Sequence, residues 1–387
     1  MKFFNINRLS LARPFPDIKT LMFQKMSYNK LLEDKLFFNQ GREALIFGLD
    51  ALNIKPGVSI LVPAYMCEST VTPLRLAGYK VIFFDIEENL KFNSVKLRVL
   101  AIKHQAKAIL VVHYFGFPCN IQEISQLCES LEIKLIEDCS HSFLSKIEID
   151  DEVTSGDIVI YSLRKSFPIR DGGALKINDS TNPKVANLFR LKPKFYFSDY
   201  FYLFSRLIEY IISFICWPNL YSNWIDNLKN LIRRKASNDN KVANFTIRKS
   251  KSPSVQLVKY VSSTRYINKT KARIIYNYNK IISSASDLGF IPQYDVLPPS
   301  CIPQWVILKD TSGGLVDKLR AKGIGACHWP GNELVPEAAA TISKYPNSKR
   351  LNFELALIPT HQSIGDRECN LIISSLEFLA ENIVLEE

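Results

Sequence analysis

The sequence predicts an α/β protein in which a mainly parallel, mixed sheet lies between helices, followed by a smaller α+β unit. Between residues 40 and 180, short apolar runs typical of strands alternate with stretches that suit helices. The chain has 387 residues, 47% of them hydrophobic and 22% charged, which is enough for two or three units with a sizeable core.

Five apolar runs are predicted to be strands, at 59–62, 81–84, 108–113, 134–136 and 158–162. The stretches between them favour helices at 42–52, 70–77 and 121–131. In parallel sheets of this kind, ligands bind at the carboxyl ends of the strands. We therefore expect functional residues directly after these runs.

The composition changes from about residue 190 to residue 250. Twelve Lys or Arg stand against four Asp or Glu between Arg190 and Lys251, so +8 of the formal net charge of +11 lies in this segment. The excess favours an anionic partner, such as a phosphorylated ligand or a membrane surface. No zinc-finger or aromatic RNA-binding motif accompanies it, so we expect no nucleic-acid partner.

Residues 195–217 form a predicted helix rich in Phe, Tyr, Ile and Leu, with Arg206 and Glu209 on a narrow polar stripe. These charges interrupt any run of about 18 apolar residues, which argues against a transmembrane span. One interpretation is a helix packed on the body of the protein or on a partner subunit. The other is peripheral membrane contact through 195–235, helped by the basic residues at 233–235.

The remaining elements complete the predicted organisation. A long helix is expected over 254–284, followed by strands at 304–308 and 356–358 and helices at 314–322 and 366–384. The predicted units are an N-terminal arm (1–36), a large domain (37–189), a basic and aromatic insertion (190–252), and the long helix with a small domain (253–387).

The eight cysteines contain no CxxC pair and no spacing typical of a metal site, so no metal is expected. The first residues lack the apolar core and cleavage site of a secretory signal. We therefore expect reduced thiols and a cytoplasmic location.

Two segments contain the residue types needed for catalysis. The run 135–138 ends in two carboxylates, which either meet water at an ordinary strand end or place Asp138 in a cleft, facing a positive charge such as a protonated ring nitrogen. Lys165 follows the strand ending at Ser162 and precedes Gly172 and Gly173. It is either a solvated surface lysine or, near bound phosphate and cofactor, an amine whose lowered pKa makes it a nucleophile.

A third segment, the helix predicted after Gly41, begins with amide groups that suit a phosphate. In their order and spacing these segments resemble the DegT/DnrJ/EryC1/StrS family of pyridoxal-phosphate (PLP) enzymes. Members are mostly sugar aminotransferases with the type I aminotransferase fold. The matching motifs are VPAY (62–65), VHYFG (112–116), IED (136–138), Lys165, DGGAL (171–175), GIG (323–325) and IPTH (358–361).

This resemblance implies a role for each matching residue. Lys165 would bond covalently to the aldehyde carbon of the cofactor and then shuttle the proton, and Asp138 would keep the pyridinium nitrogen protonated. His141 would lie near the phenolic oxygen. Ser162 and the amides around Gly41, Arg42 and Glu43 would hold the phosphate.

At other positions this sequence departs from the residues that are usual in the family. The family's stacking aromatic residue corresponds to Cys67, so the stack is absent or comes from elsewhere, such as Tyr65. An asparagine that a neighbouring subunit lends to the phosphate corresponds to Lys249. His328 and His361 occupy positions where the family contacts substrate, and each is either a substrate contact or a structural residue.

As a whole, the resemblance implies a homodimeric aminotransferase with shared active sites. It would transfer an amino group from an amino acid, such as glutamate, to a keto-sugar, expected to be nucleotide-linked, in surface polysaccharide or related biosynthesis. Two alternatives remain: a PLP-dependent sugar dehydratase-like enzyme, which Lys165 disfavours because such relatives carry His there, and a non-catalytic regulatory or scaffold protein on the same fold.

Overall fold

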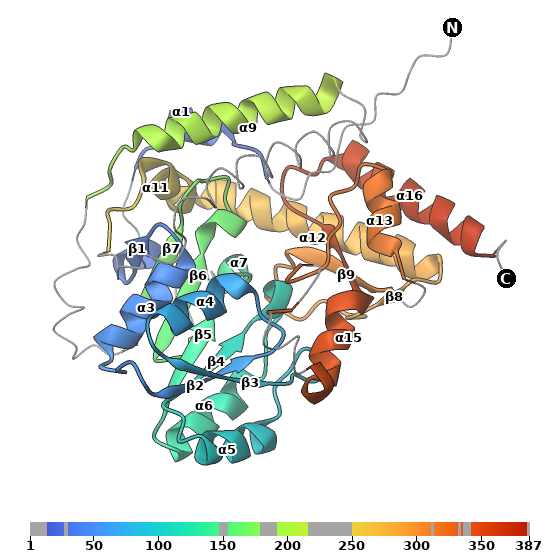
Figure 1. Cartoon of the computed structure of the whole chain (residues 1–387). Coiled ribbons are helices and arrows are strands. Elements are labelled where there is room, and N and C mark those ends of the chain that lie inside the picture. The colour runs from blue at the N-terminus through green and yellow to red at the C-terminus, as the bar shows by residue number, and fades with distance from the viewer. Residues whose placement is uncertain are drawn as a thin grey trace, which may run out of the picture.

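A computed structural model describes residues 14–26, 30–146, 154–178, 192–215, 250–310, 313–331, 334–335 and 342–384. The described chain contains a seven-stranded sheet in the order β1-β7-β6-β5-β4-β2-β3 and a three-stranded sheet in the order β10-β9-β8 (Figure 1). Helices flank the larger sheet, so the predicted α/β class with a mainly parallel mixed sheet is confirmed.

The larger sheet is formed by β1 (Leu36–Phe38), β2 (Ser59–Pro63), β3 (Lys80–Phe84), β4 (Ala108–Val112), β5 (Lys134–Asp138), β6 (Ile158–Ser162) and β7 (Gly173–Ile177). Its central strands β2 to β6 pair in parallel, whereas β7 is antiparallel to both β6 and β1. The five predicted strands match β2 to β6 within two residues at each end. Strands β1 and β7 are not predicted from the sequence, since one is three residues long and the other begins with a glycine.

The helices of the larger sheet are α3 (Gly41–Ala51), α4 (Glu68–Leu76), α5 (Ser94–Lys103), α6 (Ile121–Ser130) and α7 (Phe143–Lys146), with short 3₁₀ turns η1 (Tyr114–Gly116) and η2 (Leu163–Lys165). Helix α3 packs closely because of Gly48, where an added Cβ would lie 3.0 Å from Ile158. This contact packs the second half of α3 against the beginning of β6 and against Leu175 of β7.

The long helix predicted for 254–284 is in fact two helices, α11 (Val255–Ser262) and α12 (Thr264–Asp287). The break lies at Ser263, whose φ and ψ of −92° and 88° are not helical. Its hydroxyl accepts a hydrogen bond from the Tyr266 amide at 3.3 Å, so the serine ends one helix and caps the next. Apolar periodicity continues across the break and conceals it in the sequence.

The smaller sheet consists of β8 (Ile291–Pro292), β9 (Trp305–Lys309) and β10 (Leu355–Pro359), and all its pairs are antiparallel. Around it lie α13 (Leu315–Ala321), η3 (Ile342–Lys344), α15 (Pro346–Glu354) and α16 (Asp366–Val384). The remaining helices are α1 (Ile18–Phe23), α2 (Lys30–Glu33) and α9 (Phe197–Ile215). Within the described ranges, no helix is long and apolar enough to cross a membrane.

Gly173 should tolerate no side chain, because an added Cβ would lie 2.3 Å from the Gln40 carbonyl carbon and 2.8 Å from the Gly41 nitrogen. We expect Gly173→Ala to lower the free energy of unfolding by about 3 kcal/mol, since backbone atoms cannot move aside cheaply. The control is Ser286→Ala at an exposed position of α12, which should change the free energy of unfolding by no more than about 0.5 kcal/mol. Urea unfolding of both variants measures this, and equal midpoints would contradict the close approach.

Candidate functional site at the carboxyl ends of β5 and β6

The carboxyl ends of β5 and β6 bring together two of the predicted site residues. Asp138 is the last residue of β5 and pairs in register with Ile160 of β6, two residues before Ser162. Both side chains are buried, Asp138 at 5% exposure and Ser162 at 6%. Asp138 Oδ1 accepts a hydrogen bond from the Ser140 amide at 2.8 Å, which orients the carboxylate. The strand end therefore does not meet bulk water.

Lys165 lies in the turn η2, directly after β6, and is partly buried. The Leu163 amide donates to the Gly172 carbonyl at 2.7 Å, which closes the turn onto the beginning of β7. Phe167 is fully buried and stacks on Tyr260 with ring centroids 6.0 Å apart. The lysine thus extends from a backbone segment that is anchored on both sides.

Two glutamines from the smaller-sheet region hold the same turn. Gln304 Nε2 donates to the Lys165 carbonyl at 3.2 Å, and Gln362 Nε2 donates to the Ser166 carbonyl at 3.1 Å. Gln304 precedes β9 and Gln362 follows β10. The position of Lys165 therefore depends on both sheets, a feature that the sequence analysis did not identify.

His141 is buried beside Lys165. Its ring stacks on Phe115 at 5.5 Å with an interplanar angle of 12°, and its Nδ1 accepts a hydrogen bond from the Phe115 amide at 3.3 Å. Burial, followed by the positive charge of Lys165, lowers the pKa of His141 well below its ordinary value. The imidazole is therefore neutral near pH 7.

The beginning of α3 lies against the end of β6. A Cβ on Gly41 would lie 3.3 Å from the Tyr161 carbonyl oxygen and 3.8 Å from Ser140 Oγ. Glu43 occupies the first helical turn and its carboxylate accepts a hydrogen bond from the Asn39 amide, whereas the side chain of Arg42 is exposed. The Glu43 amide donates to the Gln40 carbonyl at 3.1 Å. Of the three predicted phosphate donors, the Gly41 and Arg42 amides are therefore the two that remain for an anion at the beginning of this helix.

An aromatic cluster borders the site. The side chain of Trp329 packs edge-on against Tyr65, Tyr114, Phe115 and His141, with ring centroids 4.8 to 5.7 Å apart. The Tyr65 hydroxyl is buried and has no hydrogen-bond partner among the described residues. A buried hydroxyl of this kind favours an additional polar group. The analysis missed Trp329, because only the folded chain brings it to the site.

Cys67 lies at the N-terminal end of α4 and is partly exposed. Its sulfur lies 2.9 Å from Ser69 Oγ and 3.6 Å from Thr70 Oγ1. The position thus carries a small polar side chain in contact with its own helix, whereas the neighbouring Tyr65 belongs to the aromatic cluster.

The two predicted substrate histidines form hydrogen bonds with the backbone near the smaller sheet. His328 Nδ1 lies 3.1 Å from the Leu355 carbonyl oxygen, so this nitrogen faces β10. His361 Nδ1 accepts a hydrogen bond from the Ser363 amide at 3.3 Å, in the loop that also carries Gln362. Lys249 lies outside the described residues.

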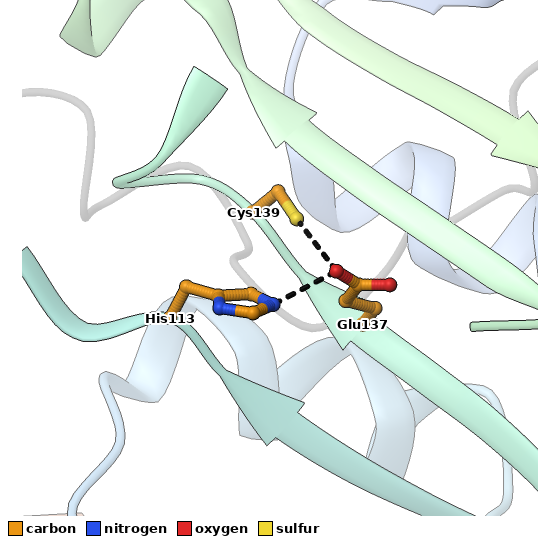
Figure 2. Close-up of side chains that lie close together, drawn as sticks. All are labelled: His113, Glu137 and Cys139. Atoms are coloured by element: carbon orange, nitrogen blue, oxygen red, sulfur yellow. Dashed lines mark hydrogen bonds and ion pairs between the residues drawn. The ribbon is translucent and has the colours of Figure 1, made fainter. Parts of the chain in front are cut away.

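Glu137, the residue before Asp138, lies on the other side of β5 in a buried charge network (Figure 2). Its carboxylate accepts hydrogen bonds from His113 Nε2 at 2.8 Å and from Lys146 Nζ at 2.9 Å. The amides of Ser155 and Gly156 donate to its other oxygen at 3.1 and 3.0 Å. Burial alone would raise the pKa of Glu137, but the donors His113 and Lys146 outweigh burial and lower it.

His113, Glu137 and Cys139 also have ligand atoms within 4.8 Å of one another, a spacing that a metal ion could use. The hydrogen bonds account for this cluster without an ion. His113 Nδ1 accepts the Cys119 amide at 3.2 Å, which leaves Nε2 as the donor to Glu137, and Lys146 supplies the positive charge. The cluster therefore fixes the position of β5 behind Asp138.

Solved structures share this fold across nearly the whole chain. The aminotransferase PseC of Helicobacter pylori, involved in pseudaminic acid biosynthesis, matches with a TM-score of 0.66 and 16% identity over 97% of this chain and 100% of its own. NtdA of Bacillus subtilis, solved with bound pyridoxamine phosphate, matches with a TM-score of 0.65 and 15% identity over 97% and 87% of the two chains. The type I aminotransferase fold is therefore confirmed.

Sequence comparison relates part of the chain to a family of aminotransferases. The model of the DegT/DnrJ/EryC1/StrS aminotransferase family matches residues 33–198, which confirms the predicted resemblance over the larger sheet. GDP-perosamine synthase of Escherichia coli O157:H7 is 32% identical over 145 residues, 37% of this chain and 40% of that enzyme. A sugar 4-aminotransferase of Saccharopolyspora spinosa, acting on dTDP-4-dehydro-2,3,6-trideoxy-D-glucose, is 22% identical over 90% of this chain and 85% of its own. The match to the perosamine synthase thus spans about two fifths of that relative's length.

Loss of the Glu137 charge should destabilise the protein in a pH-dependent way. Because its folded pKa is lower than the unfolded value of about 4.3, its stabilisation is complete above that pH and is lost as the pH falls further. Glu137→Gln removes the buried carboxylate that pairs with Lys146 at 2.9 Å and should cost about 3–5 kcal/mol at neutral pH. Urea midpoints measured from acid to neutral pH test this, with the exposed Glu132→Gln as the control. A variant that loses stability in acid as steeply as wild type would contradict the assignment.

Proposed function

We propose that this protein is a PLP-dependent aminotransferase that transfers an amino group from an amino acid to a keto-sugar. The observation that carries the proposal is the placement of Lys165 and Asp138 after neighbouring parallel strands, with the neutral His141 beside the lysine. An amine and a buried carboxylate in these places match the two groups that a PLP enzyme needs.

The residues at this edge fit the cofactor. The first amides of α3 at Gly41 and Arg42, together with the Ser162 hydroxyl, offer donors for a phosphate, whereas the Glu43 amide donates to the Gln40 carbonyl. Gly173 keeps this edge compact, because an added Cβ there would lie 2.3 Å from the Gln40 carbonyl carbon. Asp138 offers a buried anion for a protonated ring nitrogen, and His141 a neutral hydrogen-bonding group for a phenolic oxygen. When bound, PLP supplies an electron sink for the bonds at the substrate carbon.

The chain's own groups then do three things. The carboxylate of Asp138, whose Oδ1 is fixed by the Ser140 amide, favours the protonated form of the ring nitrogen. The Lys165 amine moves the proton as general base and general acid. Gln304 and Gln362 hold the lysine's turn, and Trp329 with its aromatic neighbours shields one side of the site from water.

The substrate class is supported by the names of the relatives. Two relatives, at 32 and 33% identity, are a GDP-perosamine synthase and a transaminase of Shigella dysenteriae named for dTDP-4-amino-4,6-dideoxy-D-glucose. We therefore propose a nucleotide-linked keto-sugar as acceptor and glutamate as donor, in surface polysaccharide or related biosynthesis. We further propose a cytoplasmic homodimer in which Lys249 of one subunit supports the phosphate of the other. His328, His361 and Cys67 complete the proposed site.

Replacing the lysine should abolish turnover. We expect the wild type to show visible absorbance after addition of PLP, and Lys165→Ala to lack it. The rate of amino transfer should fall by about 10⁴-fold or more in this variant. Lys103→Ala, an exposed lysine of α5, is the matched control and should behave as wild type. The absorbance spectrum and the release of 2-oxoglutarate from glutamate measure the two effects. A colourless wild type that takes up no PLP would overturn the proposal and favour the non-catalytic alternative.

Replacing the carboxylate should separate binding from catalysis. Asp138→Asn keeps the shape but removes the negative charge, so PLP should still bind through Lys165 while the rate of amino transfer falls by about 10²-fold or more. PLP binding is measured by absorbance, and the rate of amino transfer is measured in a single turnover with glutamate. An unchanged rate would contradict the role of Asp138. Sugar dehydration without transfer of glutamate nitrogen would instead support the dehydratase-like alternative.

A further inference from the structure

Helix α9 is oriented with its charged side toward the protein and its apolar side outward. Asp199 and Arg206 are 4% and 8% exposed, whereas Phe197, Phe201 and Phe204 are 89%, 70% and 61% exposed. A helix on the surface of a globular protein normally buries its apolar stripe and exposes its charges. The orientation of α9 is the reverse.

Contacts with the N-terminal arm hold this orientation. Arg206 Nη2 donates to the Pro14 carbonyl at 3.3 Å, and its guanidinium lies 5.0 Å from the centre of the Phe15 ring. The polar side of α9 is thereby attached to the body of the protein. Its outward residues recur at helical spacing and so form a single stripe, made of Phe197, Tyr200, Phe201, Phe204, Leu207 and Ile208.

Helix α1 extends this stripe. It lies beside α9 at one end of the molecule (Figure 1), and Ile18 and Leu207 border the same cavity. Ile18, Met22 and Phe23 of α1 are exposed as well. We call these three residues together with the α9 stripe the α1–α9 face.

The exposed charges on the two segments that carry this face have one sign, and the exposed Asp366, which lines the cavity beside Ile18 and Leu207, is paired with Arg273 at 2.9 Å. Between residues 14 and 26 and between 192 and 208, the exposed charged residues are Lys19, Lys25, Lys192 and Lys194, and neither of the two acidic residues is exposed. Lys19 lies on the same side of α1 as Met22 and Phe23 by helical spacing. An apolar face bordered by lysines is complementary to a surface that is apolar inside and anionic at its boundary.

We propose that the α1–α9 face docks on an anionic lipid membrane, with its aromatic side chains at the boundary between headgroups and acyl chains. Exposed Phe and Tyr supply apolar area with little loss of conformational freedom, and lysines near an anionic surface add electrostatic attraction. This is peripheral attachment, because α9 lies along the surface of the protein. A second copy of this chain is the rival occupant of the face, and sedimentation distinguishes it from a membrane.

Vesicle flotation of the full chain tests the docking. Wild type should float with phosphatidylcholine vesicles that contain phosphatidylserine, and far less with phosphatidylcholine alone or at high salt. The partition coefficient of the variant Phe197→Ser/Phe201→Ser/Phe204→Ser into the anionic vesicles should be lower than that of the wild type by about tenfold or more. Because these side chains are exposed, the variant should keep the wild-type circular dichroism spectrum.

The matched control places serines on another exposed apolar stripe. Val95, Val99 and Ile102 of α5 are 72%, 60% and 62% exposed, at the opposite end of the molecule (Figure 1). Val95→Ser/Val99→Ser/Ile102→Ser should float as wild type does. Absence of wild-type flotation, equal flotation with neutral vesicles, or equal loss in the α5 variant would each overturn the proposal. Sedimentation gives a further test. If the wild type does not float and the α9 substitutions dissociate an oligomer, the face is a contact between copies of this chain and the proposal is wrong.

Discussion

The parallel pairing of β5 with β6 is the constraint on which the proposed site depends. Its register places Asp138 opposite Ile160, so the last residues of both strands reach the same edge of the sheet. Parallel neighbours bring consecutive carboxyl ends together, whereas a shift by one residue would turn Asp138 to the opposite face. Glu137, on the opposite face of β5, stabilises this register. Four donors bind its carboxylate, and a shift of the strand would break these hydrogen bonds.

The smaller sheet completes the site. Gln304 and Gln362 donate to the backbone of the turn that carries Lys165, and Trp329 packs against His141. All three belong to segments more than one hundred residues from that turn. Relative movement of the two sheets would therefore shift the turn that carries Lys165.

The sequence predicted the central strands and most helices because their apolar periods are clear, and it placed Asp138 and Lys165 at strand ends. It missed the antiparallel pair of β1 and β7, since short or glycine-containing strands leave little pattern. It also merged α11 and α12, because Ser263 interrupts the helix through backbone angles and capping, and the apolar repeat continues. The sequence predicts a cleft position for Asp138 but gives no role to Glu137, which the structure places in a buried charge network.

The sequence by itself determined the class of fold, the order of the motifs and the residue types available for chemistry, since these follow from periodicity and local spacing. Only the tertiary structure decided which groups are neutral, which are buried and which come together. His141 is neutral because packing removes it from water beside Lys165. Similarly, the amphipathic pattern of α9 is visible in the sequence, but the direction in which its apolar side faces depends on Arg206 meeting Pro14 and Phe15, a contact between distant parts of the chain.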